Sequence, residues 1–290
     1  MALRAEPLSS NFGYVIHNQA DEDLLRLHES DISRLFKAAG ALVFRGFRMD
    51  LDRFKSFTEK FGAGFLVNGN STREPVSDEG KTQTVNPGKH FIPPHAEMGY
   101  NPLRPEIVWF YYARPAQKNG ETFLCDGIQV LSEMKPATRE LFLNKRIKFT
   151  YRNIPSDFWM RFGCNTQDEI SGLLSGLPTT TYRFNEDRSM YLEYVVSAVR
   201  TLKHDDKLAF CHSIHNQADL LHFEDGSEIP EPLRQEILFS ALSVAVIPKW
   251  QVDDVIMIDN NRVMHGRKAF DDPERRVYVR IARNVNSVTE

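Results

Sequence analysis

Cysteine is scarce in this sequence, and the three that are present lie far apart at Cys125, Cys164 and Cys211. Their spacing contains neither the CxxC pair of a structural zinc site nor a disulfide framework. Long apolar runs are also lacking, because the longest, residues 107–113, is far shorter than the roughly 20 residues of a membrane-spanning helix. We therefore expect reduced thiols, a cytoplasmic location, and neither a signal peptide nor a membrane span.

An excess of charge of either sign is absent as well. The chain has 36 lysines and arginines against 39 aspartates and glutamates, a formal charge of −3, which indicates no strong attraction to nucleic acid or anionic membranes. With 41% hydrophobic and 26% charged residues, disordered, collagen-like and coiled-coil classes are excluded. No linker or repeat is visible in the 290 residues. We expect one domain over residues 1–290, its core at about 20–284 and an insertion or lid at about 153–230.

The hydrophobic periodicity predicts helices at the start of the chain and strands in its middle and end. Helical spacing appears over residues 21–39, before Gly40, and over 51–61, before Gly62. Helices are also expected after Asp126, with an interruption at Pro136, and over 232–242; residues 63–94 and 153–180 are irregular. Short apolar runs predict strands at 41–47, 107–113, 121–126, 147–151, 243–247, 254–259 and 277–282. The pattern is typical of an α+β fold with a mainly β core and helical additions.

His95 and Glu97 are two residues apart, so on an extended strand both side chains project from the same face. A second histidine, His265, ends another strand-like run. Two histidines and one carboxylate form the facial triad of non-haem Fe(II) oxygenases, which leaves metal positions open for chemistry. A structural zinc site would add a fourth ligand, usually cysteine. The competing interpretation is a surface histidine that lies near a glutamate by chance.

The segment RRVYVRIAR near the end of the chain alternates in character. Arg276, Tyr278 and Arg280 share one face of the predicted strand, and valines and isoleucine share the other. If the arginine face points inward it needs an anion, and a carboxylate fits the guanidinium fork best. The alternative is an edge strand whose polar face meets water.

These residues carry a resemblance to a known family. PPHAEMGY, KNGETFLCDG, IDNNRVMHGRKAF and ERRVYVRIA resemble the successive motifs of the taurine dioxygenase-like (TauD/TfdA) family of Fe(II)/2-oxoglutarate oxygenases, and residues 40–62 resemble its opening helix-strand-helix. The resemblance covers about residues 20–284. It is closest to the branch with Glu in the metal motif, near clavaminate synthase-like and SyrP-like enzymes. It implies a double-stranded β-helix, or jelly roll, with N-terminal and inserted helices.

The resemblance also implies a site. His95, Glu97 and His265 match the metal ligands and so the catalytic centre. Thr122 and the arginines Arg276 and Arg280 match residues that bind 2-oxoglutarate, and which arginine makes the main salt bridge stays open, with a slight preference for Arg276. Ala96 stands where the branch usually has Asn, and Asn119 where it has Gly. Because Glu97 is intact, the halogenating variant of the chemistry is not expected.

The implied reaction uses Fe(II), O2 and 2-oxoglutarate as co-substrate, which is decarboxylated to succinate. Hydroxylation of an unactivated C–H is the usual outcome; desaturation, epoxidation and cyclisation stay open. Branch analogy favours a small polar, amino-acid-like substrate or a natural-product biosynthetic intermediate, free or tethered to a carrier protein. No nucleic-acid or membrane partner is expected, and a homo-oligomer is compatible with the sequence.

Substrate contacts are expected from the loop before the metal motif and from the residues after it. Asn70 and Arg73 resemble a loop motif of the branch, and Arg73 is a candidate for a substrate carboxylate, with a solvated loop arginine as the alternative. Tyr100 and Asn101 are expected to line the cavity, with a structural turn as the alternative. The insertion holds lid candidates that more often belong to a core, so we assign them no role: Arg152, Phe158, Trp159 and Arg161.

Two further interpretations stay open at this point. A second group, Cys211, His212, His215 and His222, has the donor atoms for zinc but not the spacing of known structural zinc motifs. A jelly-roll protein that binds metal without turnover is the rival from another class. A metal-independent hydrolase is not supported, since the chain has no GxSxG motif and no recognisable carboxylate pair.

Overall fold

The structure is a computed structural model that describes residues 3–10, 12–19, 21–69, 72–76, 80–177, 179–216 and 220–285. Its largest sheet has eight strands in the order β1-β2-β3-β15-β7-β17-β4, with β5 also paired to β17. All neighbours are antiparallel except the parallel pair β2 and β3. The strands are β1 Arg4–Pro7, β2 Tyr14–His17, β3 Ala41–Arg45, β4 Gly62–Leu66, β5 Gln83–Thr84, β7 Ile107–Arg114, β15 Asp254–Asp259 and β17 Arg276–Val285.

A smaller sheet faces the large one. It has three antiparallel strands in the order β6-β16-β8, namely β6 Ile92–His95, β16 Val263–Arg267 and β8 Thr122–Asp126. Apolar side chains from both sheets form one cluster between them, including Phe110 and Val279 from the large sheet and Leu124 from the small one. Two facing antiparallel sheets are the arrangement expected of a jelly roll.

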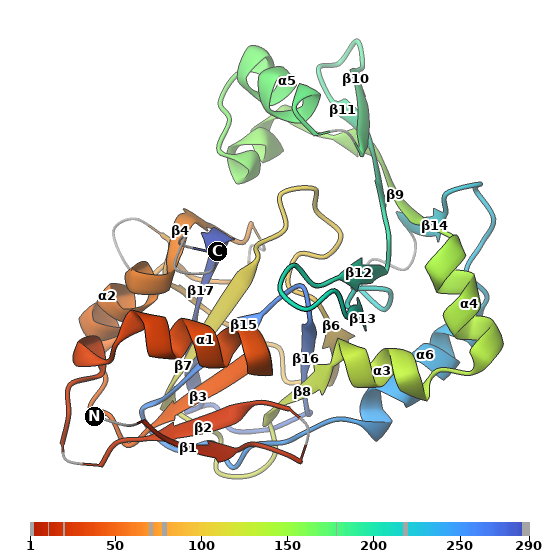
Figure 1. The fold of residues 1–290 in the computed structure, drawn as a ribbon. Coiled ribbons are helices and arrows are strands. Elements are labelled where there is room, and N and C mark those ends of the chain that lie inside the picture. Colours follow the sequence, from red (N-terminus) through yellow and green to blue (C-terminus); the bar gives the residue numbers. More distant parts are fainter. Residues whose placement is uncertain are drawn as a thin grey trace.

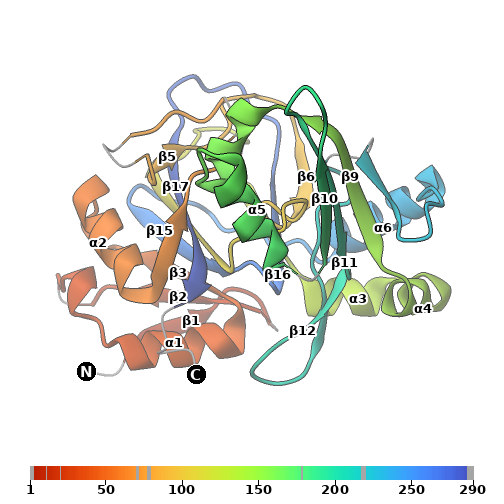
Figure 2. The same ribbon diagram turned by 90° about the horizontal axis from the view of Figure 1, so that it is seen from above.

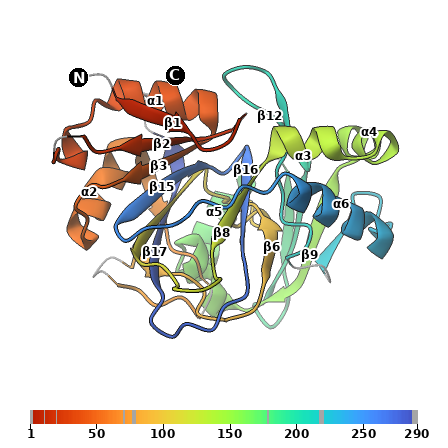
Figure 3. The same cartoon turned by 90° about the horizontal axis from the view of Figure 1, so that it is seen from below.

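Two N-terminal helices cover the outer face of the large sheet, as Figures 1 and 3 show. Helix α1 Glu29–Ala39 buries Ile32 and Phe36, and ends at Gly40, whose left-handed backbone (φ 73°) suits glycine. Helix α2 Leu51–Phe61 begins at Asp50, which accepts a hydrogen bond from the Arg53 backbone N–H at 2.8 Å. The predicted helix 51–61 is therefore confirmed, whereas 21–39 contains a short 3-10 turn, η1 Leu24–Arg26, before α1 begins.

Three more helices pack on the other side of the molecule, against the small sheet and a third sheet (Figures 1 and 3). They are α3 Gly127–Glu133, α4 Pro136–Asn144 and α6 Glu231–Ser243. Pro136 is the first residue of α4, so the predicted interruption at this proline is confirmed. The prediction of a strand at 243–247 was wrong: α6 continues through Ser243, and Val246 makes only an isolated bridge to Leu124.

The third sheet carries the insertion above the core, as Figures 1 and 2 show. Its order is β10-β11-β9-β14, and β9 extends from the α4 side of the molecule up to a lobe that also contains η2 and α5. The lobe has its own apolar cluster around Trp159, Ile170 and Leu192. The bounds are β9 Ile147–Ile154, η2 Ser156–Phe162, α5 Gln167–Ser175, β10 Thr180–Phe184, β11 Met190–Val196 and β14 Leu221–Phe223; β12 Val199–Thr201 and β13 Leu208–Phe210 form a separate hairpin.

No helix in the described part of the chain has the length and apolar character needed to cross a bilayer.

Candidate metal centre

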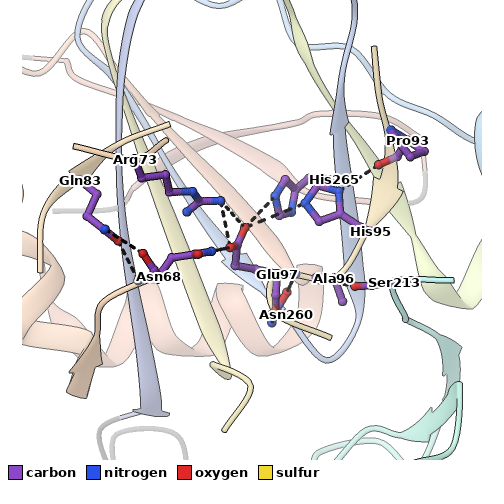
Figure 4. A network of polar contacts seen from close by, with 10 residues as sticks. All are labelled: Asn68, Arg73, Gln83, Pro93, His95, Ala96, Glu97, Ser213, Asn260 and His265. Carbon is purple, nitrogen blue, oxygen red and sulfur yellow. Dashed lines mark hydrogen bonds and ion pairs between the residues drawn. The ribbon is translucent and has the colours of Figure 1, made fainter. Parts of the chain in front are cut away.

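Three side chains that the sequence analysis selected meet in the small sheet. His95 is the last residue of β6, Glu97 follows in the next turn, and His265 lies in the middle of β16, directly opposite His95 in the strand register. Figure 4 shows the two imidazoles turned towards the carboxylate. The Glu97 Oε2 atom lies 3.5 Å from His265 Nε2 and 4.0 Å from His95 Nε2. Within the described residues this is the one group of three His, Cys, Asp or Glu side chains able to hold a metal ion.

The imidazole of His95 is held in the form that a metal ligand needs. Its Nδ1 atom lies 2.9 Å from the carbonyl oxygen of Pro93, so a proton on Nδ1 is donated there and the Nε2 lone pair faces Glu97. Burial and the neighbouring His265 lower the pKa of His95 to about 3. The ring is therefore neutral at physiological pH and free to bind a cation.

The two oxygens of the Glu97 carboxylate have different partners. Oε1 accepts a hydrogen bond from Asn68 Nδ2 at 2.6 Å and from Arg73 Nη2 at 3.0 Å, while Oε2 is the atom nearest both histidines. Arg73 also lies 3.2 Å from Oε2. Burial alone raises the pKa of Glu97, but Arg73 and the histidines outweigh it and hold that pKa below its usual value. The carboxylate is thus ionised, with Oε2 directed at the metal position.

Backbone contacts fix the turn that carries Glu97. The side chain of Asn260, which is fully buried, accepts from the Glu97 N–H at 2.8 Å and donates to the Glu97 carbonyl at 2.9 Å. The same amide donates to Pro105 O at 2.8 Å. Asn260 was not selected from the sequence, because an asparagine after a strand has no signal that distinguishes it from an ordinary turn residue.

The structure gives the substrate-loop residues different positions. Arg73, predicted for a substrate carboxylate, pairs instead with Glu97 and is largely buried. Asn70 lies outside the described residues. Tyr100 and Asn101 line a cavity of about 680 Å³ next to the metal turn.

Thr122 lies on the same face of the small sheet as the metal ligands. In the strand register His265 is opposite both His95 and Leu124, and Thr122 is opposite Arg267, so these side chains share one face. Thr122 is buried, and its carbonyl accepts a hydrogen bond from Trp250 Nε1 at 2.9 Å. Its position on the metal side is therefore compatible with the role that the resemblance implies.

Arg276 and Arg280 do not face the metal. Phe110 contacts the His265 ring, at 5.1 Å between ring centroids, and Phe110 is paired with Val279. The face of β17 that carries Val279 therefore points inward, and the arginine face points outward.

The outward face provides its own partners. Arg280 is fully buried there, donates to Thr82 Oγ1 at 2.7 Å and to Glu59 at 3.2 Å, and lies over the ring of Phe65. Arg276 is exposed to solvent. The expectation that this arginine face points inward was wrong, since helix α2 and its Glu59 cover it.

A different pair of arginines lies near Thr122. Arg275 precedes Val277 by two residues, continues the inward alternation, and lines a cavity of about 200 Å³ together with Tyr112 and Trp250. Arg267, opposite Thr122, is 4% exposed, and both guanidinium groups lie over the Phe270 ring.

These two arginines have no carboxylate partner. In the described part of the chain neither forms an ion pair, and Arg267 donates only to backbone carbonyls, including Asn86 O at 2.6 Å. Burial and Arg275 lower the pKa of Arg267 to about 10. Glu121 also lines the cavity beside Arg275, but it pairs with Lys268, so the two arginines still favour an anion at this end of the sheet. Neither residue was predicted from the sequence, although the Arg275-Arg276 pair is visible in it.

The second histidine cluster is not assembled. His212 is buried against the Phe149 ring, while the Cys211 thiol lies 3.2 Å from the Asn260 carbonyl oxygen and 3.4 Å from Arg104 Nη2. His222 is on β14, opposite Lys148. Among the residues with described coordinates, these four do not form a metal-binding group.

Comparison with known proteins agrees with this geometry. The family model for taurine catabolism dioxygenase TauD, TfdA family, matches residues 4–282. The dapdiamide synthesis protein DdaC of Enterobacter agglomerans is 25% identical over 276 residues, 86% of this chain and 83% of that protein. A clavaminate synthase-like protein of Arabidopsis thaliana is 24% identical over 278 residues, 84% of this chain and 82% of that protein.

A solved structure supports the predicted fold. The crystal structure of a taurine dioxygenase from Burkholderia xenovorans has a TM-score of 0.64 at 15% identity, covering 98% of this chain and 89% of that chain. The predicted jelly-roll core with added helices is confirmed by this likeness together with the two facing sheets. Because the family model spans nearly the whole chain and the metal triad is assembled, this chain belongs to the TauD/TfdA family and is an Fe(II)- and 2-oxoglutarate-dependent dioxygenase.

Proposed function

We propose that this dioxygenase hydroxylates an unactivated C–H of a small amino-acid-like molecule or natural-product intermediate. The observation that carries the oxygenase chemistry is the triad of His95, Glu97 and His265, whose ligand atoms lie within 4.8 Å of one another. Two imidazoles and one carboxylate leave three positions for co-substrate and O2. The biosynthetic role is supported by the relatives described as a dapdiamide synthesis protein and a clavaminate synthase-like protein.

The residues present fit iron. The Nε2 atoms of both histidines and Oε2 of Glu97 would hold it, since His95 Nδ1 is occupied by the Pro93 carbonyl oxygen and both Nε2 atoms lie within 4.0 Å of Oε2. Iron bound there would allow O2 to act as the oxidant, with 2-oxoglutarate supplying two electrons and leaving as succinate and CO2. Everything else the chain does is positioning: Pro93 orients His95, and Asn68 and Arg73 orient Glu97.

For 2-oxoglutarate we propose Thr122 and Arg275 as the binding residues, with Arg275 taking the role that the resemblance implied for Arg276 or Arg280. Arg275 is the arginine at this end of β17 that lies on the inward face, beside Tyr112 and Trp250. The stacked rings of Tyr112 and Trp250, 4.1 Å apart, form an apolar wall that keeps water away from the pair. A guanidinium binds a carboxylate with two parallel hydrogen bonds, which fixes its orientation.

Location and partners follow as further parts of the proposal. The three cysteines are buried and free, which supports a reducing compartment such as the cytoplasm. The substrate is free or tethered to a carrier protein, and a homo-oligomer is compatible with the fold.

An anaerobic titration with Fe(II) and 2-oxoglutarate tests the proposal. The weak visible charge-transfer band of the chelate is expected in the wild type and absent in His265→Ala. Arg275→Ala should require roughly 10- to 100-fold more 2-oxoglutarate, because a charge-assisted pair is lost, while Arg276→Ala should titrate like the wild type.

Other results of this titration would contradict the assignment or separate the possible reactions. No band in folded, iron-loaded wild type would contradict the oxygenase assignment. A band without succinate release over a broad substrate set would favour the non-catalytic metal-binding protein. Product mass separates hydroxylation, a gain of one oxygen atom, from desaturation or cyclisation, a loss of two hydrogens; an epoxide needs the position of the oxygen as well.

A further inference from the structure

A cavity of about 680 Å³ lies between the turn that carries Glu97 and the lobe. Its inner end lies next to the turn of the metal centre, because Asn68, which lines the cavity, donates to Glu97 Oε1 at 2.6 Å; His95, Glu97 and His265 themselves are not part of the lining. Met98, the residue after Glu97, also lines it. A molecule that fills this cavity therefore places one end beside the metal ligands and the other under the lobe.

The lobe wall of the cavity is apolar. It is formed by Ile154, Phe158, Phe162 and Leu192. Phe158 is 37% exposed, although the neighbouring Trp159 is buried in the lobe's own cluster. The exposed part of such an aromatic side chain at a cavity provides contact area for a ligand.

The charge of the lining is one-sided. Arg152 is exposed at the rim, where it also borders an outer groove that holds Arg183, Glu186, Asp187 and Tyr191, and it forms no ion pair with any described residue. The described lining residues include no aspartate or glutamate; the other polar groups are amides and tyrosine hydroxyls, such as Asn101 and Asn153. An ammonium group enclosed here would lose its water without gaining a carboxylate partner.

The two walls are held together. The hydroxyl of Tyr151 on β9 donates to the Tyr100 carbonyl at 2.9 Å, which links the base of the lobe to the metal turn. The distance from the metal ligands to the apolar wall is therefore set by the fold, and one size of substrate is favoured.

We propose that the substrate of this site is a carboxylate with an uncharged, partly apolar body, whose amino group, where it has one, is acylated. This inference rests on the proposed function. Arg152 takes the carboxylate at the rim, the aromatic wall takes the body, and the reacting carbon lies at the inner end near Asn68. A free small amino acid carries an ammonium that these residues do not match, and it fills only part of a cavity of this volume.

The test uses the holoenzyme with Fe(II) and 2-oxoglutarate under anaerobic conditions. The charge-transfer band alone tests the proposed function, before any substrate is added. Its perturbation is then followed with matched sets of three probes per side chain: the N-acyl amino acid, the free amino acid, and the N-acyl amino acid amide, which lacks the carboxylate. Several aliphatic and aromatic side chains are included. The N-acyl acids are expected to act at least ten-fold below the concentration of both other members.

Arg152→Gln should raise the concentration needed for the N-acyl acid roughly 10-fold and leave that for the amide unchanged. Arg183→Gln is the matched control, because Arg183 is also an exposed lobe arginine but lies over the Tyr191 ring and does not line this cavity. A normal band that no N-acyl acid perturbs, a free amino acid that binds as well as its N-acyl form, or unaltered discrimination in Arg152→Gln would each overturn the inference. An absent band would instead count against the proposed function.

Discussion

The Glu97 carboxylate divides its two oxygens between the metal position and the protein. Oε2 is nearest the two imidazoles, Asn68 holds Oε1, and Arg73 contacts both oxygens, Oε1 more closely. A carboxylate held in this way reaches its ligand geometry before the metal arrives, so less conformational entropy is lost on binding. The Arg73 charge also lowers the basicity of Glu97, but the loss of a fixed rotamer is the larger effect expected when it is removed.

Replacing Arg73 therefore weakens metal binding. Arg73→Leu is expected to raise the Kd for Mn(II) roughly 10- to 100-fold, in the range seen when groups that orient metal ligands are removed. Calorimetry or the Mn(II) EPR signal of the free ion measures this without turnover. Arg73→Lys keeps the charge and should recover part of the affinity. An unchanged Kd in a folded Arg73→Leu protein would contradict the positioning role.

Arg280 is expected to contribute to stability rather than to 2-oxoglutarate binding. Arg280→Met keeps most of the packing on Phe65 but removes the bonds to Thr82 and Glu59, so the free energy of unfolding should fall by roughly 1–2 kcal/mol. Denaturant unfolding measures this change. The half-saturating 2-oxoglutarate concentration should stay at the wild-type value, and a large rise in it with unaltered stability would restore the role that family spacing implied.

For single residues, the sequence predicted which residue types form the site better than it predicted the direction in which their side chains point. The alternation of Val277 and Val279 with the arginines was correct, but which face points inward depends on what covers the sheet. Helices α1 and α2 take the outer face, and this is a tertiary fact with no local signal. Arg73 was selected as functional, but its partner could not be predicted, because residues 63–94 have no periodicity from which to place the loop.

Among the elements, β16 is the one that completes the centre. It lies between β6 and β8, so the strand that carries His265 is hydrogen-bonded to a neighbour on each side. Gly266 lets the neighbours come close: a Cβ at this position would lie 2.6 Å from the Ile92 carbonyl oxygen and would also overlap the Phe123 ring. The absence of a side chain here therefore sets the spacing of β6 and β8 around the metal ligands.

Gly266→Ala is expected to separate these strands. Its main effect should be on the Kd for the metal, with a smaller loss in the free energy of unfolding. Mn(II) binding should weaken at least 10-fold, since a displacement of His265 relative to His95 breaks the ligand geometry, and the melting temperature should also fall. Gly172→Ala in α5 is the control, because no atom outside its neighbours and the local helix backbone lies within 4 Å of its added Cβ, and alanine favours helix. Wild-type metal affinity in Gly266→Ala would show that the strand spacing is not critical.

Helix predictions succeeded where caps and buried periodic positions agreed, as in 51–61 with Asp50 and three buried phenylalanines. The strand predicted at 243–247 failed because a short apolar run does not distinguish a strand from the end of a helix and the loop after it. The helix extends to Ser243 because α6 buries Ile237 and Ala241 against the core.

For the whole molecule, the centre joins distant parts of the chain into one folded unit, so ligands should stabilise it. Mn(II) with 2-oxoglutarate at about 100 times Kd adds roughly 2.7 kcal/mol to the free energy of unfolding, which corresponds to a rise in melting temperature of roughly 5 °C or more for a chain of this size. Differential scanning calorimetry measures the shift. His265→Ala should show none, and an equal shift in that variant would indicate binding elsewhere.

The same calorimetric trace bears on the domain organisation, which stays a prediction. One cooperative transition would support a single domain over residues 1–290. Two transitions would indicate that the lobe, with its separate cluster around Trp159 and Ile170, unfolds by itself.

The position of His265 opposite His95 also has a consequence during biosynthesis. His95 and Glu97 are translated roughly 170 residues before His265, an interval of roughly 10–30 s at about 5–20 residues per second. During this time the nascent chain holds two of the three ligands and has no β16 to bring them into register. Iron can therefore be captured in the complete site only after synthesis has passed β16.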